Sequence, residues 1–255
     1  MAPKKSIAFI HCGLGKAGNW RGLINALGSG LTVHNIELPG HGLAEDWDRS
    51  RDYTEQALEI ALSEMPSDAV PLIGHSYGAA LALRLAVERP YRVSSLVLIE
   101  PVLFAAAKGR WGYDKAMRDL EPFEKKMKAA QFATAAKEFF ALWGGGTAWS
   151  DLSADQKAYI MDRIETIPAG NSLLKDDRSG ILQPGRIEAL EIPVTFVDGG
   201  ESHPVIADII SELGDRMKDA EWLTVPDAGH MVPVTHPELV AKGIRDRLVW
   251  EETEN

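Results

Sequence analysis

Short apolar runs rich in isoleucine, valine and leucine recur along this chain and are separated by segments of helix length. This alternation is typical of a mostly parallel sheet with helices on its faces, because parallel strands need long crossovers and are buried on both sides. Six runs have the length and composition of strands: residues 6–11, 32–37, 69–74, 95–100, 193–198 and 221–225. The sequence therefore predicts an α/β fold on a six-stranded sheet.

Helical spacing of apolar residues predicts helices at 20–27, 54–65 and 79–89 in the first part of the chain. After the fourth predicted strand, about ninety residues pass before the fifth, far more than a usual connection. Three helices are predicted there, at 123–130, 132–143 and 154–166, and the segment is rich in aromatic residues, among them Trp111, Tyr113, Phe132, Phe139, Phe140, Trp143 and Trp149. We interpret residues 102–189 as a helical cap inserted after the fourth strand, with 1–101 and 190–255 forming the core.

The charge balance excludes whole classes of partner. The chain carries 27 basic and 37 acidic residues, a formal net charge of −10, whereas nucleic acids and anionic membranes attract clustered positive charge. No apolar run approaches the length of a transmembrane helix, and residues 7–10 are too few for a signal-peptide core. The single cysteine, Cys12, excludes an internal disulfide framework. We expect a cytoplasmic protein with no nucleic-acid or membrane partner.

The sequence Gly74-His75-Ser76-Tyr77-Gly78 carries the clearest chemical signal. A G-x-S-x-G pattern alone is weak, but here it follows a predicted strand and precedes an Ala- and Leu-rich predicted helix. In that setting the glycines make room for a tight turn that exposes the serine hydroxyl. The amide of Tyr77 and the start of the helix then lie where they can stabilise a developing negative charge. Ser76 is therefore the predicted nucleophile.

A serine hydroxyl is a weak nucleophile at neutral pH, so this interpretation requires a histidine base farther along the chain. His230 meets the requirement, because it lies on a glycine-containing loop just after the last predicted strand. His236 is the nearby competitor. It precedes Pro237 and is better suited to the start of a helix, so we favour His230 as the base.

The chain resembles the α/β-hydrolase family. Four motifs occur in that family's order: HCGLG at 11–15 with Trp20, ELPGHG at 37–42, the serine turn at 74–78 and the histidine loop at 226–231. The resemblance implies that the backbone amides of Gly13 and Tyr77 form an oxyanion hole. It also implies that the six strands correspond to the third to eighth of the family, with a shortened N-terminus.

The acid of the predicted triad departs from the family pattern. Many members carry aspartate in a G-x-x-D sequence after the fifth of these strands, where this chain reads DGGESH at 198–203, with serine or histidine in that position. Three carboxylates remain as candidates: Glu100, Asp198 and Glu201. We favour Glu100, because it ends an apolar strand where an unpaired carboxylate would be costly to bury, so a specific partner is expected.

These residues predict acyl transfer: an ester, thioester or lactone acylates Ser76, and His230 then activates water. The aromatic and alanine-rich cap favours a small to medium carboxylic ester as the small-molecule substrate. No metal or organic cofactor is needed, and the remaining histidines lack the paired spacing of a metal site.

Two other functions stay open in the sequence. A cofactor-free lyase or C–C bond hydrolase would use the same triad. A non-catalytic small-ligand receptor would use only the fold, although the presence of both Ser76 and His230 argues against it. The sequence leaves the oligomeric state open.

Overall fold

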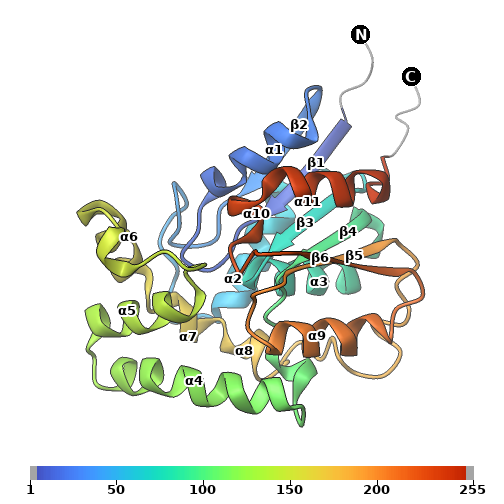
Figure 1. Ribbon diagram of the computed structural model, residues 1–255. Helices are drawn as coiled ribbons and strands as arrows, with labels where there is room; N and C mark the ends of the chain where they lie inside the picture. Colours follow the sequence, from blue (N-terminus) through green and yellow to red (C-terminus); the bar gives the residue numbers. More distant parts are fainter. Residues whose placement is uncertain (1–4, 251–255) are drawn as a thin grey trace.

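The computed structural model describes residues 5–250 and contains one six-stranded sheet (Figure 1). The strands are β1 (Lys5–Ile10), β2 (Leu31–Ile36), β3 (Val70–His75), β4 (Val93–Ile99), β5 (Val194–Gly199) and β6 (Ala220–Val225). Their order is β2-β1-β3-β4-β5-β6, and every pairing is parallel. The predicted α/β fold with six strands is confirmed, with strand ends shifted by one or two residues.

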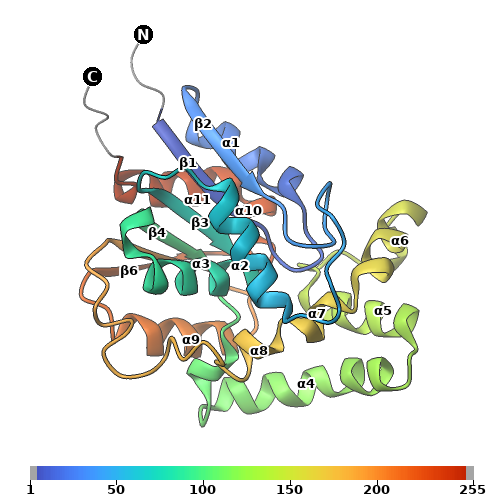
Figure 2. The same ribbon diagram turned by 180° about the vertical axis from the view of Figure 1, so that it is seen from behind.

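Helices cover both faces of the sheet, as Figure 1 and Figure 2 show from opposite sides. The helices of the two layers are α1 (Arg21–Leu27), α2 (Tyr53–Glu64), α3 (Tyr77–Glu88), α9 (Val205–Gly214), α10 (Val232–Thr235) and α11 (Pro237–Ile244). Alternate residues of β1 face opposite layers: Ile7 and Phe9 belong to the core cluster that includes residues of α1, α10 and α11, whereas Ala8 and Ile10 belong to the cluster that includes residues of α2 and α3. The inner strands β1, β3, β4 and β5 are therefore buried on both sides, which explains their continuous apolar sequences, whereas the edge strands β2 and β6 are partly exposed.

The segment between β4 and β5 is helical and lies at the end of the sheet where the strands terminate (Figure 1). Its helices are α4 (Trp111–Lys128), α5 (Phe132–Trp143), α6 (Ala154–Arg163), α7 (Thr166–Ala169) and α8 (Asn171–Leu174). The prediction of a first helix beginning at residue 123 was wrong, because α4 runs through Pro122. Burial of Gly112, Ala116, Leu120 and Phe123 along one face holds the helix together across the proline.

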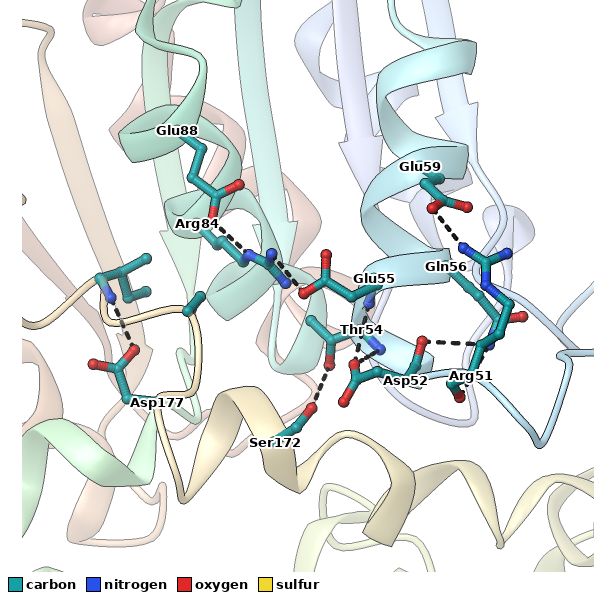
Figure 3. A network of polar contacts seen from close by, with 12 residues as sticks. Arg51, Asp52, Thr54, Glu55, Gln56, Glu59, Arg84, Glu88, Ser172 and Asp177 are labelled. Atoms are coloured by element: carbon teal, nitrogen blue, oxygen red, sulfur yellow. Dashed lines mark hydrogen bonds and ion pairs between the residues drawn. The ribbon is translucent and has the colours of Figure 1, made fainter.

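Polar contacts tie this helical segment to the two helices beneath the nucleophile turn (Figure 3). The buried Arg84 guanidinium of α3 pairs with Glu55 of α2, with 2.8 Å between nitrogen and oxygen, and with Glu88 at the same distance. The hydroxyl oxygens of Thr54 and Ser172 lie 3.2 Å apart and join α2 to α8. The Tyr77 hydroxyl donates to Thr54 at 3.1 Å. The residue after the predicted nucleophile is thus connected to the inserted helices.

The strand order indicates where a ligand site can lie. The chain leaves β1 toward one edge of the sheet, to β2, and then continues from β3 toward the other edge, so the direction of the connections reverses between β1 and β3. In open parallel sheets, ligand sites lie beyond the carboxyl ends of the strands at such a reversal. Gly13 follows β1 and Ser76 follows β3, so both lie there. Within residues 5–250, no helix combines the length and apolar character needed to cross a membrane.

Candidate active site

Ser76 occupies a strained turn between β3 and α3. Its φ of 58° and ψ of −117° lie where side chains are rarely found, and its backbone N–H donates to the Ile99 carbonyl at 2.9 Å. The glycines on either side permit this close packing. A Cβ at Gly74 would lie 2.3 Å from the Gly78 carbonyl oxygen, and one at Gly78 would lie 2.2 Å from the carbonyl oxygen of Ile10. Both glycines of the motif are therefore required by the turn itself.

His230 lies against Ser76 although 154 residues separate them. The imidazole Nε2 is 2.9 Å from the Ser76 hydroxyl oxygen, and both side chains are more than nine-tenths buried. The loop after β6 bends at Asp227, whose φ is 57°, and turns the histidine back over the sheet. His236 is instead the residue before α11, as the sequence indicates.

Glu100 completes a continuous chain of hydrogen bonds. Its carboxylate Oε2 lies 3.0 Å from Nδ1 of His230, and the side chain is fully buried. The other carboxylate oxygen accepts hydrogen bonds from the Gly199 N–H at 2.7 Å and the Ser202 hydroxyl at 2.5 Å. The buried charge is thus met by three donors, which is the condition for burying a carboxylate at acceptable cost.

The two rival carboxylates do not contact His230. Asp198, within β5, accepts a hydrogen bond from the Trp222 indole at 2.9 Å. Burial raises the pKa of Asp198 above its ordinary value, and hydrogen bonds from Trp222 and Thr224 offset part of that increase. Glu201 is exposed on the loop that follows. Of the three candidate acids, the structure brings only Glu100 to the histidine.

The amides of Gly13 and Tyr77 lie beside this chain of side chains. Both residues line the same cavity as Ser76 and His230. Tyr77 is the first residue of α3, where backbone N–H groups have no partner within the helix. A Cβ at Gly13 would lie 2.9 Å from the Ile167 side chain of α7, so glycine also fits the inserted helices closely there.

A sequence model of the alpha/beta hydrolase family matches residues 7–242. The chain belongs to this family. It is 25% identical over 244 residues to the pimeloyl-(acyl-carrier protein) methyl ester esterase of Nitrosomonas europaea, covering 91% of each chain. It is 28% identical over 254 residues to an sn-1-specific diacylglycerol lipase of Mus musculus, covering 91% of this chain and 77% of the relative.

Solved structures agree on the fold. The enol-lactonase of Burkholderia xenovorans aligns with a TM-score of 0.70 at 18% identity, covering 96% of this chain and 91% of the other. Together with the family match and the relatives named as esterases, the comparisons support an ester-cleaving hydrolase at the level of the family.

The hydrolase has a large cavity between its sheet and the inserted helices. The volume is about 960 Å³, near the upper end of the range for small-molecule sites, roughly 300–1,000 Å³. Its apolar wall includes Leu120, Phe123, Phe139, Phe140, Trp143 and Ile160. The Trp143 ring lies over His230, with 4.8 Å between ring centroids. Two other aromatic residues of this segment, Trp111 and Phe132, are instead exposed at 66% and 38%.

Two histidines that sequence reasoning considered only as metal ligands hold the site in place. The Nε2 of His41 accepts the Leu14 N–H at 3.1 Å, next to Gly13, and its Nδ1 lies 3.0 Å from the Pro39 carbonyl. The Nε2 of His75 lies 2.8 Å from the carbonyl oxygen of His230 and donates to it. Their sequence positions next to the motifs were visible, but nothing in the sequence showed what they would contact.

Tyr159 of α6 also holds the loop after β1. Its hydroxyl donates to the Gly15 carbonyl at 2.7 Å and accepts the Gly42 N–H at 3.2 Å. Cys12, in the same loop, is buried, and burial raises the pKa of its thiol to about 12. It therefore remains a thiol at neutral pH. No group of three or more potential metal-binding side chains occurs in the described part of the chain.

The two buried histidines should make the folded protein less stable in weak acid. Burial lowers the pKa of His41 and of His75 to about 3, against about 6.5 in an unfolded chain. Between pH 6.5 and 3 the unfolded state therefore binds two more protons than the folded state. The free energy of unfolding should fall with decreasing pH, by about 1.4 kcal/mol per pH unit for each histidine once the unfolded chain is protonated.

Urea unfolding from pH 8 down to pH 5 measures this slope. Above pH 7, we expect these two histidines to leave the free energy of unfolding nearly constant. Near pH 5, their combined contribution to its slope should approach about 2.7 kcal/mol per pH unit. His41→Gln and His75→Gln should each remove about half of the slope. Equal slopes in the wild type and both variants would show that these histidines are protonated in the folded protein.

Proposed function

We propose that this chain is a serine hydrolase that cleaves a carboxylic ester through an acyl-enzyme at Ser76. The observation that carries the proposal is the continuous contact from the Ser76 hydroxyl to Nε2 of His230 and from Nδ1 to the Glu100 carboxylate, at 2.9 and 3.0 Å. A nucleophile, a base and an acid that orients the base are thereby aligned, which is the arrangement required for acyl transfer.

In the first half of the reaction, the Ser76 oxygen attacks the ester carbonyl and His230 accepts the hydroxyl proton at Nε2. Glu100 accepts the hydrogen bond from Nδ1, which fixes the ring orientation and stabilises the imidazolium. The carbonyl oxygen becomes negatively charged, and the N–H groups of Gly13 and Tyr77 donate to it. Collapse of this intermediate breaks the bond to the alcohol oxygen, which takes the proton from His230.

In the second half, a water molecule attacks the acyl group on Ser76 while His230 removes its proton. The tetrahedral intermediate collapses with transfer of that proton back to the Ser76 oxygen, releasing the carboxylic acid and the free enzyme. Glu100 keeps the same contact with His230 in both halves. The reaction uses no group beyond the side chains and amides already described.

The cavity favours an ester with a substantial apolar part. Its wall is mainly aliphatic and aromatic, and its volume of about 960 Å³ accommodates a medium-length acyl chain. Two relatives are named as a methyl ester esterase and a diacylglycerol lipase, which also act on esters. We assign residues 102–189 as the cap that forms this wall, over a core formed by the flanking segments.

Reaction with a fluorophosphonate probe tests the proposal, because an activated serine displaces fluoride from the probe and becomes phosphonylated, whereas an ordinary serine does not react. We expect one adduct per chain, mapped to the Ser76 peptide by mass spectrometry and lost in Ser76→Ala. A series of p-nitrophenyl esters from acetate to decanoate then measures turnover and the chain-length optimum. An unlabelled, folded protein without esterase activity would indicate a receptor, and a labelled protein idle on every ester would indicate a lyase or C–C bond hydrolase.

A further inference from the structure

The turn after β5 carries a serine where the family resemblance leads one to look for the acid. Ser202 stands three residues after Gly199, and its hydroxyl donates to Oε1 of Glu100 at 2.5 Å. The Gly199 N–H donates to the same oxygen at 2.7 Å, whereas Oε2 faces Nδ1 of His230 at 3.0 Å. The two oxygens of Glu100 therefore have separate tasks: one is held by the turn, and the other is directed at the histidine.

The turn is rigid enough to hold that oxygen. The Ser202 N–H donates to the Gly199 carbonyl at 3.0 Å, and the Glu201 N–H donates to the Ala228 carbonyl at 2.9 Å. Gly199 packs so tightly that an added Cβ would lie 2.2 Å from the Ala228 oxygen. These contacts join the turn to the loop that carries His230, so Ser202 and His230 share one framework.

Glu100 needs this support because its backbone is not in strand conformation. Its φ is 50°, and its N–H donates to the Val197 carbonyl at 2.8 Å. The residue leaves the end of β4 and directs a flexible side chain toward the next strand. A carboxylate on such a side chain can rotate unless both oxygens have partners, and hydrogen bonds to a charged group are among the stronger ones.

We propose that Ser202 is a positioning residue that orients the Glu100 carboxylate toward His230, taking over the turn position from which the acid has moved to the neighbouring strand. This inference rests on the proposed serine hydrolase function. Ser202 is absent from the wall of the 960 Å³ cavity and lines a smaller neighbouring cavity of about 360 Å³, which His230 also lines. Because its hydroxyl donates to Glu100, we expect it to act on the rate through Glu100, and the KM of a Ser202 variant records any direct contact with substrate.

A double-mutant cycle tests the inference in the full-length protein with a p-nitrophenyl ester as substrate. Ser202→Ala should lower kcat about tenfold and leave KM within about twofold, because one charge-assisted hydrogen bond is lost. Ser202→Thr, which keeps the hydroxyl, should retain most of the kcat. In a Glu100→Gln background, Ser202→Ala should change kcat by less than about threefold, since the charged group on which it acts is gone.

Two outcomes would overturn the inference: an unchanged kcat in Ser202→Ala, or the same proportional loss in both backgrounds. The second pattern would indicate a general structural effect, and thermal unfolding of each variant records that effect separately. Fluorophosphonate labelling distinguishes the failure of this inference from that of the proposed function. If Ser76 is labelled and turnover depends on it, but the cycle shows no coupling between Ser202 and Glu100, only the role of Ser202 is refuted. If Ser76 of the wild type does not react with the probe, the role of Ser202 and the proposed serine hydrolase function are both refuted.

Discussion

Replacement of Ser76 by alanine is expected to lower kcat/KM for a p-nitrophenyl ester by about 10⁵-fold. The hydroxyl is the only group at this position that can form the acyl-enzyme, and the Oγ lies 2.9 Å from Nε2 of His230. The remaining activity would come from the cavity and the amides of Gly13 and Tyr77, which can still bind the ester and polarise its carbonyl. KM should change much less than kcat, because the cavity wall is intact.

Ser63→Ala serves as a matched control. This serine lies exposed near the end of α2, where its hydroxyl donates to the Ile60 carbonyl, and it does not line the cavity that holds Ser76 and His230. The control should keep wild-type kinetics. If Ser76→Ala retained more than about one hundredth of the wild-type kcat/KM, Ser76 would not be the nucleophile, and direct attack by water would have to be considered.

The sheet was predictable because its signals are local. The four inner strands are buried on both faces, so their apolar runs stand out in the sequence, and the runs alone give the place of all six strands to within two residues. The turn at 74–78 was equally visible, since packing against Ile10 and Gly78 leaves no room for side chains at its glycines. Where backbone packing dictates the residue type, the residue type identifies the structure.

The helices were less predictable where tertiary contacts outweigh local preference. Pro122 normally ends or kinks a helix, so local signals place a helix start after it, whereas buried contacts carry α4 through it. Helix α9 was not predicted at all. Its buried residues, such as Ile206 and Ile209, recur at helical spacing, so the helix signal was present in the sequence, although their β-branched side chains favour a strand.

The supporting residues of the site could not be predicted, because their roles depend on contacts between distant segments. His75 and His230 are 155 residues apart, and the bond from the His75 ring to the His230 carbonyl leaves no trace in either motif. Ser202 is similar: the sequence shows that an aspartate is missing there, but not that a hydroxyl in its place would reach Glu100. Both contacts depend on the direction in which side chains point at the ends of neighbouring strands, which the sequence does not reveal.

The assignment of Glu100 as the acid of the triad can be tested by substituting, one at a time, a carboxylate on each of two neighbouring strands. Glu100→Gln is expected to lower kcat by about 10³- to 10⁴-fold, as when a catalytic histidine loses its orienting carboxylate. The amide has nearly the same shape, but it removes the negative charge opposite Nδ1 and can present an N–H to that nitrogen. The ring then no longer has a fixed tautomer, and the imidazolium formed during acylation is not stabilised.

Asp198→Asn is the matched control, because this carboxylate lies one strand away, is buried and is held by Trp222 of β6. Its register partner on β6 is Thr224, and its hydrogen-bond partner Trp222 lies on the same edge strand, whereas the His230 ring contacts Glu100. We therefore expect kcat within about threefold of wild type. If Glu100→Gln kept most of its turnover while Asp198→Asn lost a hundredfold or more, Asp198 and not Glu100 would be the acid, and the side chains would have to rearrange during catalysis.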